Sequence, residues 1–307
     1  MIKYISKRLA VSAITLWIIT TVSFFLLRML PGNPFGSLSA MDPQMQERMI
    51  HYYGLDLPLS EQYLSYMANL FQGDLGYSLK NAGQHVNDII ARTFPFSLQL
   101  GLQAYLISFP IGLFLGILAA LNRGKPLDHC LVAFTAFGAA IPVFILGTLL
   151  QYVFAIKLRL LPVAQWKSAA HTILPTMVLA IGAIASKARS MRTLMLEVMD
   201  EDYIRTARAK GLSRSRIVWK HQIRNAILPI VSTMGVEIAS ILMGSFVVEQ
   251  IFAIPGLGAY YVTSIQNLDY TMTLGLTVFY STFVVTANLI VDIMYGFIDP
   301  RIRISET

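Results

Sequence analysis

The sequence predicts an all-α protein that crosses a membrane several times. Of its 307 residues, 55% are hydrophobic and only 13% are charged, whereas an ordinary globular domain carries about a quarter charged residues. The apolar residues gather in runs of about 20, the length that a helix needs to cross the hydrocarbon of a bilayer. Because every backbone polar group must be satisfied inside the hydrocarbon, such continuous runs indicate helices rather than barrel strands.

Six apolar runs meet this length requirement, provided that the shortest borrows residues on either side. They cover Leu9–Leu27, Ser97–Leu121, Leu131–Ile156, Thr172–Ser186, Ala226–Val248 and Thr271–Phe297. The fourth run is the short one, and we expect Lys187 and Arg189 beyond it to extend their cationic heads to the lipid headgroups. The first run could instead be a cleaved signal peptide, but no clear small-x-small site precedes Pro31.

The positions of Lys and Arg predict the orientation. With six spans both termini share one side, and that side collects 17 of the 24 Lys and Arg residues, ten of them within 187–224. Because loops rich in Lys and Arg stay in the cytoplasm, both termini are expected to be cytoplasmic, in the plasma or inner membrane of a cell. This placement explains the net charge of +7 better than nucleic acid, which we do not expect as a partner.

The spans divide the chain into four parts. Residues 1–30 form an N-terminal transmembrane helix, 31–96 an extracytoplasmic helical segment, 97–298 a core of five transmembrane helices with the cytoplasmic loop 187–224, and 299–307 a cytoplasmic tail.

The extracytoplasmic segment is predicted to contain two helices. Asp42–Pro43 and Gly54 bound the first, and Ser60 and Gly73 bound the second. The second carries an apolar stripe, which can pack on the membrane bundle and can also serve as a docking platform for an external partner. The stripe consists of Tyr63, Tyr66, Met67 and Leu70.

No pattern in the sequence supplies an active site. Gly124–Lys125 is followed by Pro126, which breaks a nucleotide-binding P-loop. Gly256-Leu-Gly258 is followed by Tyr261 where a dinucleotide fingerprint needs a small residue, so we interpret it as a turn or re-entrant structure. No zinc pair or nucleophile elbow is found. We therefore predict no catalytic residue, no metal ligand and no cofactor bound by this chain.

Small and charged residues inside the spans indicate specific packing. Gly112-x-x-x-Gly116 allows a close approach of helices. Glu237 lies within the fifth span, where a carboxylate costs about 2.5–3.5 kcal/mol on insertion scales, so it should face the bundle interior or a water-filled path. A contact with the substrate pathway and a structural hydrogen bond to a neighbouring helix both stay open. Asp292, on the same helical face as Asn288, is expected to be a packing or interface residue.

The basic loop predicts two short amphipathic helices. In the first, Ile204 and Ala207 form an apolar side, Arg205 and Arg208 lie opposite, and Gly211 is placed to stop the helix. The second runs from Ser213 to Arg224, and Pro229 marks the entry to the fifth span. Such helices could lie on anionic lipid or insert into the groove of a soluble partner, and physical reasoning leaves both open.

Several motifs resemble those of ATP-binding-cassette (ABC) importer permeases. Arg-Thr-Ala-Arg-Ala-Lys-Gly at 205–211, followed by Ile-Leu-Pro at 227–229, is similar to their coupling-loop signature, Glu-Ala-Ala-x-x-x-Gly and then Ile-x-Leu-Pro. Arg205 and Thr206 replace Glu-Ala and the interval to Pro229 is longer, and both departures match the peptide and nickel subfamily. Further matches are Leu-Pro-Gly-Asn-Pro at 30–34, Gly-Asp-Leu-Gly-Tyr-Ser at 73–78, the segment 249–258 and Asp-Pro-Arg-Ile-Arg at 299–303. The large outer segment is typical of the first of two paired permease subunits.

The resemblance implies a type I ABC importer permease fold and a transmembrane subunit of an ATP-driven peptide importer, closest to the oligopeptide permeases. The same architecture importing nickel, glutathione or another small solute is the alternative. It implies as partners a second permease subunit, two ATPase subunits that bind ATP and Mg²⁺, and an extracytoplasmic peptide-binding protein. The chain itself would hydrolyse nothing. The implied ATPase-coupling residues are Tyr203, Ile204, Arg205, Thr206, Ala207, Arg208, Ala209, Lys210 and Gly211.

Overall fold

The computed structural model describes residues 2–30, 48, 50–51, 54–80 and 83–298. Within these residues the backbone forms helices and no strand, apart from one antiparallel bridge between Tyr77 and His85. The first predicted helix of the outer segment, after Asp42–Pro43, lies for the most part outside the described residues. Most of 30–34 and all of the tail motif at 299–303 also lie outside them.

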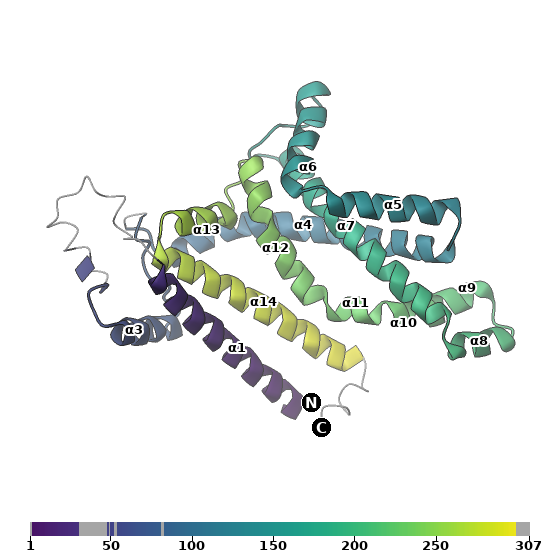
Figure 1. Ribbon diagram of the computed structural model, residues 1–307, viewed down its shortest axis with the longest axis horizontal. Coiled ribbons are helices and arrows are strands. Elements are labelled where there is room, and N and C mark those ends of the chain that lie inside the picture. The colour runs from purple at the N-terminus through teal and green to yellow at the C-terminus, as the bar shows by residue number, and fades with distance from the viewer. Residues whose placement is uncertain (1, 31–47, 49, 52–53, 81–82, 299–307) are drawn as a thin grey trace.

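Four described helices are long and apolar enough to cross a membrane, and a bent pair makes up to five. The four are α1 (Ile2–Met29), α4 (Val86–Leu121), α7 (Ala169–Met199) and α14 (Tyr270–Ile298). Figure 1 shows α1 beside α14 along most of their length, and α4 and α7 make the most extensive helix pair. The total of six spans stays a prediction.

Two of these helices extend beyond the predicted spans. The helix α4 begins at Val86 rather than Ser97, with the His85 ring accepting a hydrogen bond from the Asn87 backbone N–H at 3.3 Å. The helix α7 continues 13 residues past Ser186 to Met199. At a rise of about 1.5 Å per residue, both are longer than the bilayer is thick, so each reaches well out of the hydrocarbon.

The third predicted span is not a straight helix. It consists of α5 (Pro126–Ala140), α6 (Val143–Leu150) and the π-helical turn η2 (Gln151–Lys157), with a bend of 100° between the two arms. Ile141 has extended backbone angles because proline at 142 disfavours the helical conformation of the residue before it. The second arm therefore projects from the bundle, as Figure 1 shows.

The fifth predicted span is also interrupted. It is made of α11 (Leu228–Ser232) and α12 (Met234–Ile251), which meet at Thr233, and Pro229 lies in the first turn of α11 as expected. A short helix, α13 (Leu257–Gln266), then follows Gly256 and connects α12 to α14, consistent with the turn interpretation of Gly256-Leu-Gly258.

In the outer segment, α3 (Leu59–Phe71) confirms the second predicted helix and its packing stripe. Tyr63, Tyr66 and Leu70 pack on the buried Phe24 of α1. The predicted cap is wrong: Pro58 occupies the N-cap position and Ser60 lies inside the first turn. Proline at this point has a fixed φ that suits entry into a helix.

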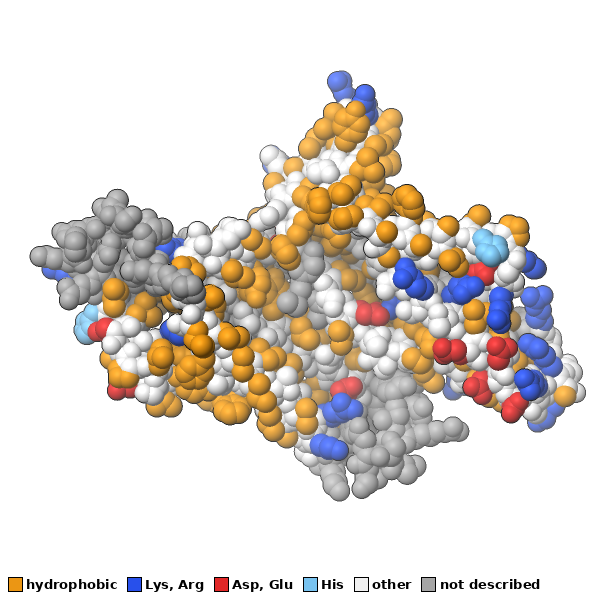
Figure 2. Space-filling model, in the orientation of Figure 1, with side chains coloured by type: hydrophobic (Ala, Val, Ile, Leu, Met, Phe, Trp, Pro, Cys, Tyr) orange, Lys and Arg blue, Asp and Glu red, His pale blue; other side chains and the backbone are white. Residues whose placement is uncertain are grey.

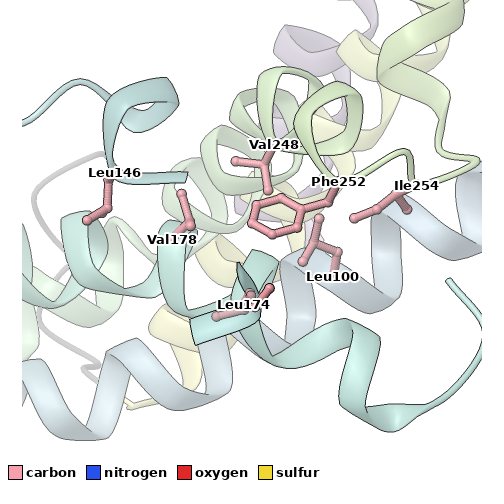
Figure 3. Close-up of a cluster of buried hydrophobic side chains, with 8 residues drawn as sticks. Leu100, Leu146, Leu174, Val178, Val248, Phe252 and Ile254 are labelled. Atoms are coloured by element: carbon pink, nitrogen blue, oxygen red, sulfur yellow. The ribbon is translucent and has the colours of Figure 1, made fainter. Parts of the chain in front are cut away.

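The core lies where α4, α6, α7 and α12 meet (Figure 3). Leu100, Leu174 and Phe252 are at most 1% exposed there. In a bilayer the lipid tails are as apolar as these side chains, so the stabilisation comes from close packing rather than from removal of water. The labelled residues come from these four helices and from the segment that follows α12: Leu100, Leu146, Leu174, Val178, Val248, Phe252 and Ile254.

Gly112 and Gly116 confirm the predicted close helix approach, and α7 is the partner. A Cβ at Gly112 would lie 2.6 Å from Cβ of Lys187, and one at Gly116 would lie 2.6 Å from both the Ala188 carbonyl oxygen and Cβ of Met191. Because backbone atoms cannot move aside without shifting a helix, the α4–α7 contact depends on these two glycines.

Buried carboxylates hold the outer connections in place. Asp269 precedes α14 and accepts hydrogen bonds from the Ser78 hydroxyl and from the backbone N–H groups of Leu79 and Met272. It therefore caps α14 and ties the Gly-Asp-Leu-Gly-Tyr-Ser motif to it. Glu249, also buried, accepts from the Gly258 N–H at 2.8 Å and fixes the start of α13. These contacts show a structural role for the motif at 73–78 and for the segment 249–258.

Candidate functional site: the basic hairpin and the charged pair above it

The basic loop folds into a helical hairpin directly after α7. Its first arm is α8 (Asp202–Ala209), and its second is α9 (Arg214–Arg216), the π-helical η3 (Ile217–Ile223) and α10 (Arg224–Ala226). We call residues 202–226 the coupling hairpin. Figure 2 shows Lys and Arg side chains concentrated at this end of the molecule.

The two arms pack through the residues that the sequence indicated. Ile204, Ala207 and Ile217 are buried together, with Leu212 and Val198 beside them. Burial of one face of a helix as short as α8 is what keeps it folded, since isolated helices of this length are unstable in water. The predicted apolar side of the hairpin is confirmed.

Gly211 ends α8 as predicted. Its φ is +71°, a conformation that glycine adopts without the strain of a Cβ. The Leu212 N–H donates to the Ala207 carbonyl at 3.3 Å, which closes the helix end. The second arm begins at a cap, because the Ser213 hydroxyl accepts from the Arg216 N–H at 3.4 Å. These contacts fix the turn between α8 and α9, where the chain reverses direction.

The outer surface of the hairpin is polar and aromatic. Arg205 pairs with Asp202 at 3.3 Å on the exposed side of α8. Tyr203 is 40% exposed and Trp219 is 68% exposed. Partial burial raises the pKa of the Tyr203 hydroxyl above its ordinary value, although a hydrogen bond with Asn225 opposes the shift. Sequence reasoning missed Trp219, whose only signal was a lone tryptophan within a basic loop.

Lys187 is buried and forms an ion pair with Glu237, so the expectation that it reaches the lipid headgroups is wrong. Only 7% of its side chain is exposed, and its Nζ contacts Oε2 of Glu237 on α12. The Lys187 stem crosses α4 at Gly112, where a Cβ would collide with it. The ammonium also lies 5.3 Å from the centroid of the Phe109 ring, within range of a cation–π contact. Arg189, by contrast, is exposed and donates to the Thr135 carbonyl at 3.1 Å.

Glu237 does face into the bundle on one side, as predicted. Its second carboxylate oxygen lies 3.2 Å from the Thr233 hydroxyl, and a third of its side chain is exposed. Near this site the Tyr105 hydroxyl is buried and forms no hydrogen bond with any described residue. The structure therefore supplies the contact to a neighbouring helix that sequence reasoning left open, and it leaves part of the carboxylate accessible.

Asp292 and Asp128 also form pairs between elements. Asp292 of α14 lies 3.1 Å from Arg8 of α1, in agreement with an interface role. The buried Asp128, at the start of α5, accepts two hydrogen bonds from Arg192 of α7, at 2.7 and 2.8 Å. Such bidentate pairs fix geometry as well as adding energy. The Arg192–Asp128 pair thereby attaches the start of α5 to the C-terminal half of α7.

No group of three or more metal-ligating side chains lies close together in the part of the chain that the structure describes. One helix, α7, connects the bundle to the hairpin: Lys187 on this helix pairs with Glu237, and the hairpin follows its C-terminal end. The fold and this loop define the class of protein, a helical membrane protein with an exposed basic hairpin.

Comparison with known proteins identifies the family. Residues 112–304 match the model of the binding-protein-dependent transport system inner membrane component, and residues 1–101 match the model of the N-terminal part of such membrane components. The chain belongs to this family. It is therefore a multi-pass inner-membrane permease subunit and not an ATPase.

The relatives cover the whole chain. The dipeptide transport system permease protein DppB of Bacillus subtilis is 45% identical over 306 residues, covering 100% of this chain and 99% of that protein. The oligopeptide transport system permease protein OppB of Haemophilus influenzae is 43% identical over 305 residues, covering 99% and 100%. OppB of Salmonella typhimurium is 40% identical over 305 residues, with the same coverage.

Solved structures share the fold at low identity. A chain of the MetNI methionine ABC transporter superimposes with a TM-score of 0.54 at 20% identity, covering 68% of this chain and 94% of that one. An amino acid ABC transporter gives a TM-score of 0.52 at 18% identity, covering 70% and 94%. The fold is thus that of ABC importer permeases.

The Lys187–Glu237 pair can be tested by a double-mutant cycle on the purified protein in detergent. Lys187→Met leaves a partly buried carboxylate without its cation, and loss of one partner of a buried pair costs about 3–5 kcal/mol. We expect a large drop in melting temperature for Lys187→Met. The double variant, Lys187→Met with Glu237→Gln, should lose less than the sum of the losses of the two single variants.

The control is Arg189→Met, which removes an exposed cation two residues along the same helix and should lower the melting temperature far less. Additive losses in the double variant would show that the two side chains are not coupled.

Proposed function

We propose that this chain is one of two permease subunits of an ATP-driven peptide importer, forms half of its translocation pathway, and connects the pathway to cytoplasmic ATPases through the coupling hairpin. The observation that carries the proposal is full-length similarity to permeases of dipeptide and oligopeptide transport systems. The basic hairpin at the end of α7 supports it, because a folded, exposed helical arm is a suitable contact for a soluble motor.

The assembly has three further kinds of partner. A second permease subunit completes the pathway, two ATPase subunits bind ATP and Mg²⁺, and an extracytoplasmic binding protein delivers the peptide. Both termini and the hairpin lie in the cytoplasm, in accord with the positive-inside rule. The outer end of the molecule, around α3, then serves as the docking platform for the binding protein.

Coupling residues are those of α8 and its stop, Tyr203 to Gly211. Closure of the ATPases on ATP displaces the hairpin as a unit, because its two arms share the buried contact of Ile204 with Ile217. The exposed Tyr203 and Trp219 supply aromatic anchors of the kind that dominate protein interfaces. Since the hairpin continues α7 with only Asp200 and Glu201 between, its displacement reaches the bundle.

Glu237 is the candidate pathway residue. Its exposed fraction suits a water-filled path, since a charged side chain facing lipid is costly. Lys187 pairs with one carboxylate oxygen, and the other accepts from the Thr233 hydroxyl and keeps a second lone pair for polar groups of a passing substrate. A peptide carries both an ammonium and amide donors that match such an acceptor.

Competition uptake in cells carrying the complete system tests the substrate. Radiolabelled peptide uptake should be lost on deletion of this gene, and unlabelled peptides of graded length should compete with it. Nickel and glutathione should not compete. If the gene is required for uptake of nickel and not of peptide, the substrate belongs to the alternative class.

The single cysteine tests the orientation. Cys130 is exposed at the start of α5, which the proposal places on the cytoplasmic side. A membrane-impermeant maleimide should label it in inside-out vesicles and leave it unlabelled in intact cells, whereas a permeant maleimide should label it in both. Labelling of intact cells by the impermeant reagent would reverse the proposed topology.

Substitutions in the hairpin test coupling in the reconstituted complex. Ala207→Glu forces a charge into the contact with Ile204 and Ile217, and Gly211→Pro is incompatible with a φ of +71°. We expect both to abolish peptide-stimulated ATP hydrolysis and uptake, while peptide capture by the binding protein is unchanged.

Ala209→Glu, on the exposed side of α8, is the matched comparison, because it adds the same charge without burying it and should keep the melting temperature of the parent. Normal peptide-stimulated ATP hydrolysis in Ala207→Glu and Gly211→Pro would contradict the assignment of coupling to this hairpin.

A further inference from the structure

An open pocket of about 470 Å³ lies between the coupling hairpin and the cytoplasm-side end of α4. Three arginines line it, from three separate places in the chain: Arg123 after α4, Arg208 at the end of α8 and Arg214 at the start of α9. Apolar side chains, among them Leu121 and Ile217, also line it. The pocket therefore combines concentrated positive charge with an apolar lining.

The positive charge of the pocket is poorly compensated. Arg123 has one acidic neighbour, Asp200, at 3.9 Å, and both side chains are largely exposed, so the attraction is weak. Arg208 and Arg214 make no ion pair with any described residue. Three guanidinium groups held around one cavity repel one another, and an anion placed among them would relieve that repulsion.

A buried polar side chain also points to a ligand. Gln222 of η3 lines the pocket, is only 3% exposed, and its Oε1 has no hydrogen-bond partner among the described residues. A buried acceptor without a partner is costly. A ligand that carries a hydroxyl beside its anionic group could donate to this oxygen. The ligand would thus meet donors from the arginines and an acceptor from Gln222.

The depth of the pocket distinguishes the source of the anion. Its lining includes Ala120 and Leu121, the last turn of α4 and the end of the second apolar run, where we expect hydrocarbon to give way to headgroups. Apolar side chains beside three arginines match a molecule with acyl chains and a phosphate. We propose that this pocket binds the phosphate headgroup of an anionic phospholipid from the cytoplasmic leaflet, a step that rests on the proposed orientation.

Bound lipid would bridge the hairpin to the membrane. Two of the three arginines, Arg208 and Arg214, belong to opposite arms of the hairpin, and Arg123 belongs to the bundle. A phosphate that contacts all three would join both arms of the hairpin to the bundle. The lipid composition of the membrane would then influence how firmly the hairpin is seated.

The test is a titration of the purified complete importer with fluorescent phosphatidylglycerol, with phosphatidylcholine bearing the same label as the reference lipid. Arg123→Gln with Arg214→Gln should weaken phosphatidylglycerol binding about thirtyfold, equivalent to about 2 kcal/mol, because each cation near an anionic surface contributes about 1 kcal/mol. Binding of phosphatidylcholine should change little. Arg123→Lys with Arg214→Lys, which keeps the charge but not the forked donor geometry, should give an intermediate loss.

The matched control is Arg216→Gln with Lys220→Gln, which removes two exposed cations from the same hairpin but outside the pocket lining. It should retain most of the affinity, and melting curves establish that all variants are folded. Equal loss in both pairs, or no loss in the pocket pair, overturns the proposal. Displacement of the labelled lipid by millimolar inorganic phosphate would assign the pocket to a soluble phosphate instead.

Loss of ATPase association in the pocket pair, with phosphatidylglycerol binding unchanged, would assign the surface to the ATPase and also overturn the proposal. The lipid titration needs no transport, so its failure is separable from failure of peptide uptake.

Discussion

The close contact between α4 and α7 is the interaction on which the rest of the structure depends. Gly112 and Gly116 remove the side chains that would hold the two helices apart. That contact gives the Lys187 stem a path across α4, and the resulting ion pair fixes α12 against both. The Arg192–Asp128 pair then attaches α5 farther along the same helix. The order of these contacts follows the axis of α7, from the bundle toward the hairpin.

Apolar run length placed the membrane segments well, because the thickness of hydrocarbon limits every spanning helix in the same way. It could not describe their breaks. Pro95 and Pro110 lie inside the continuous helix α4, whereas Pro142 accompanies a bend of 100°. The residue type is identical in all three places, and neighbouring helices decide whether the freed backbone is accommodated. Hence the third span was located correctly but its shape was not.

In the candidate site, local features were predictable and distant ones were not. The buried face of α8 and the stop at Gly211 depend on residues within a dozen positions of one another, so periodicity and glycine revealed them. The partner of Glu237 lies 50 residues away, and Lys187 looked like a residue at a span end. Similarly, Arg123 and Arg208 line one pocket only because the fold brings their helices together. Long side chains inside a membrane are directed by the nearest opposite charge, which sequence position alone does not disclose.

The unbroken course of α7 has a geometric consequence. From Ala169 to Met199 it is a single helix of 31 residues with one internal proline, so it behaves as a stiff rod. At about 1.5 Å per residue it is about 46 Å long, and a tilt of about 10° carries one end about 8 Å relative to the other. The position of the pivot matters as much as the length: the glycine contacts with α4 lie at Lys187 to Met191, past the middle of α7 and toward Met199. A push at the Met199 end would therefore swing the longer Ala169 end the other way.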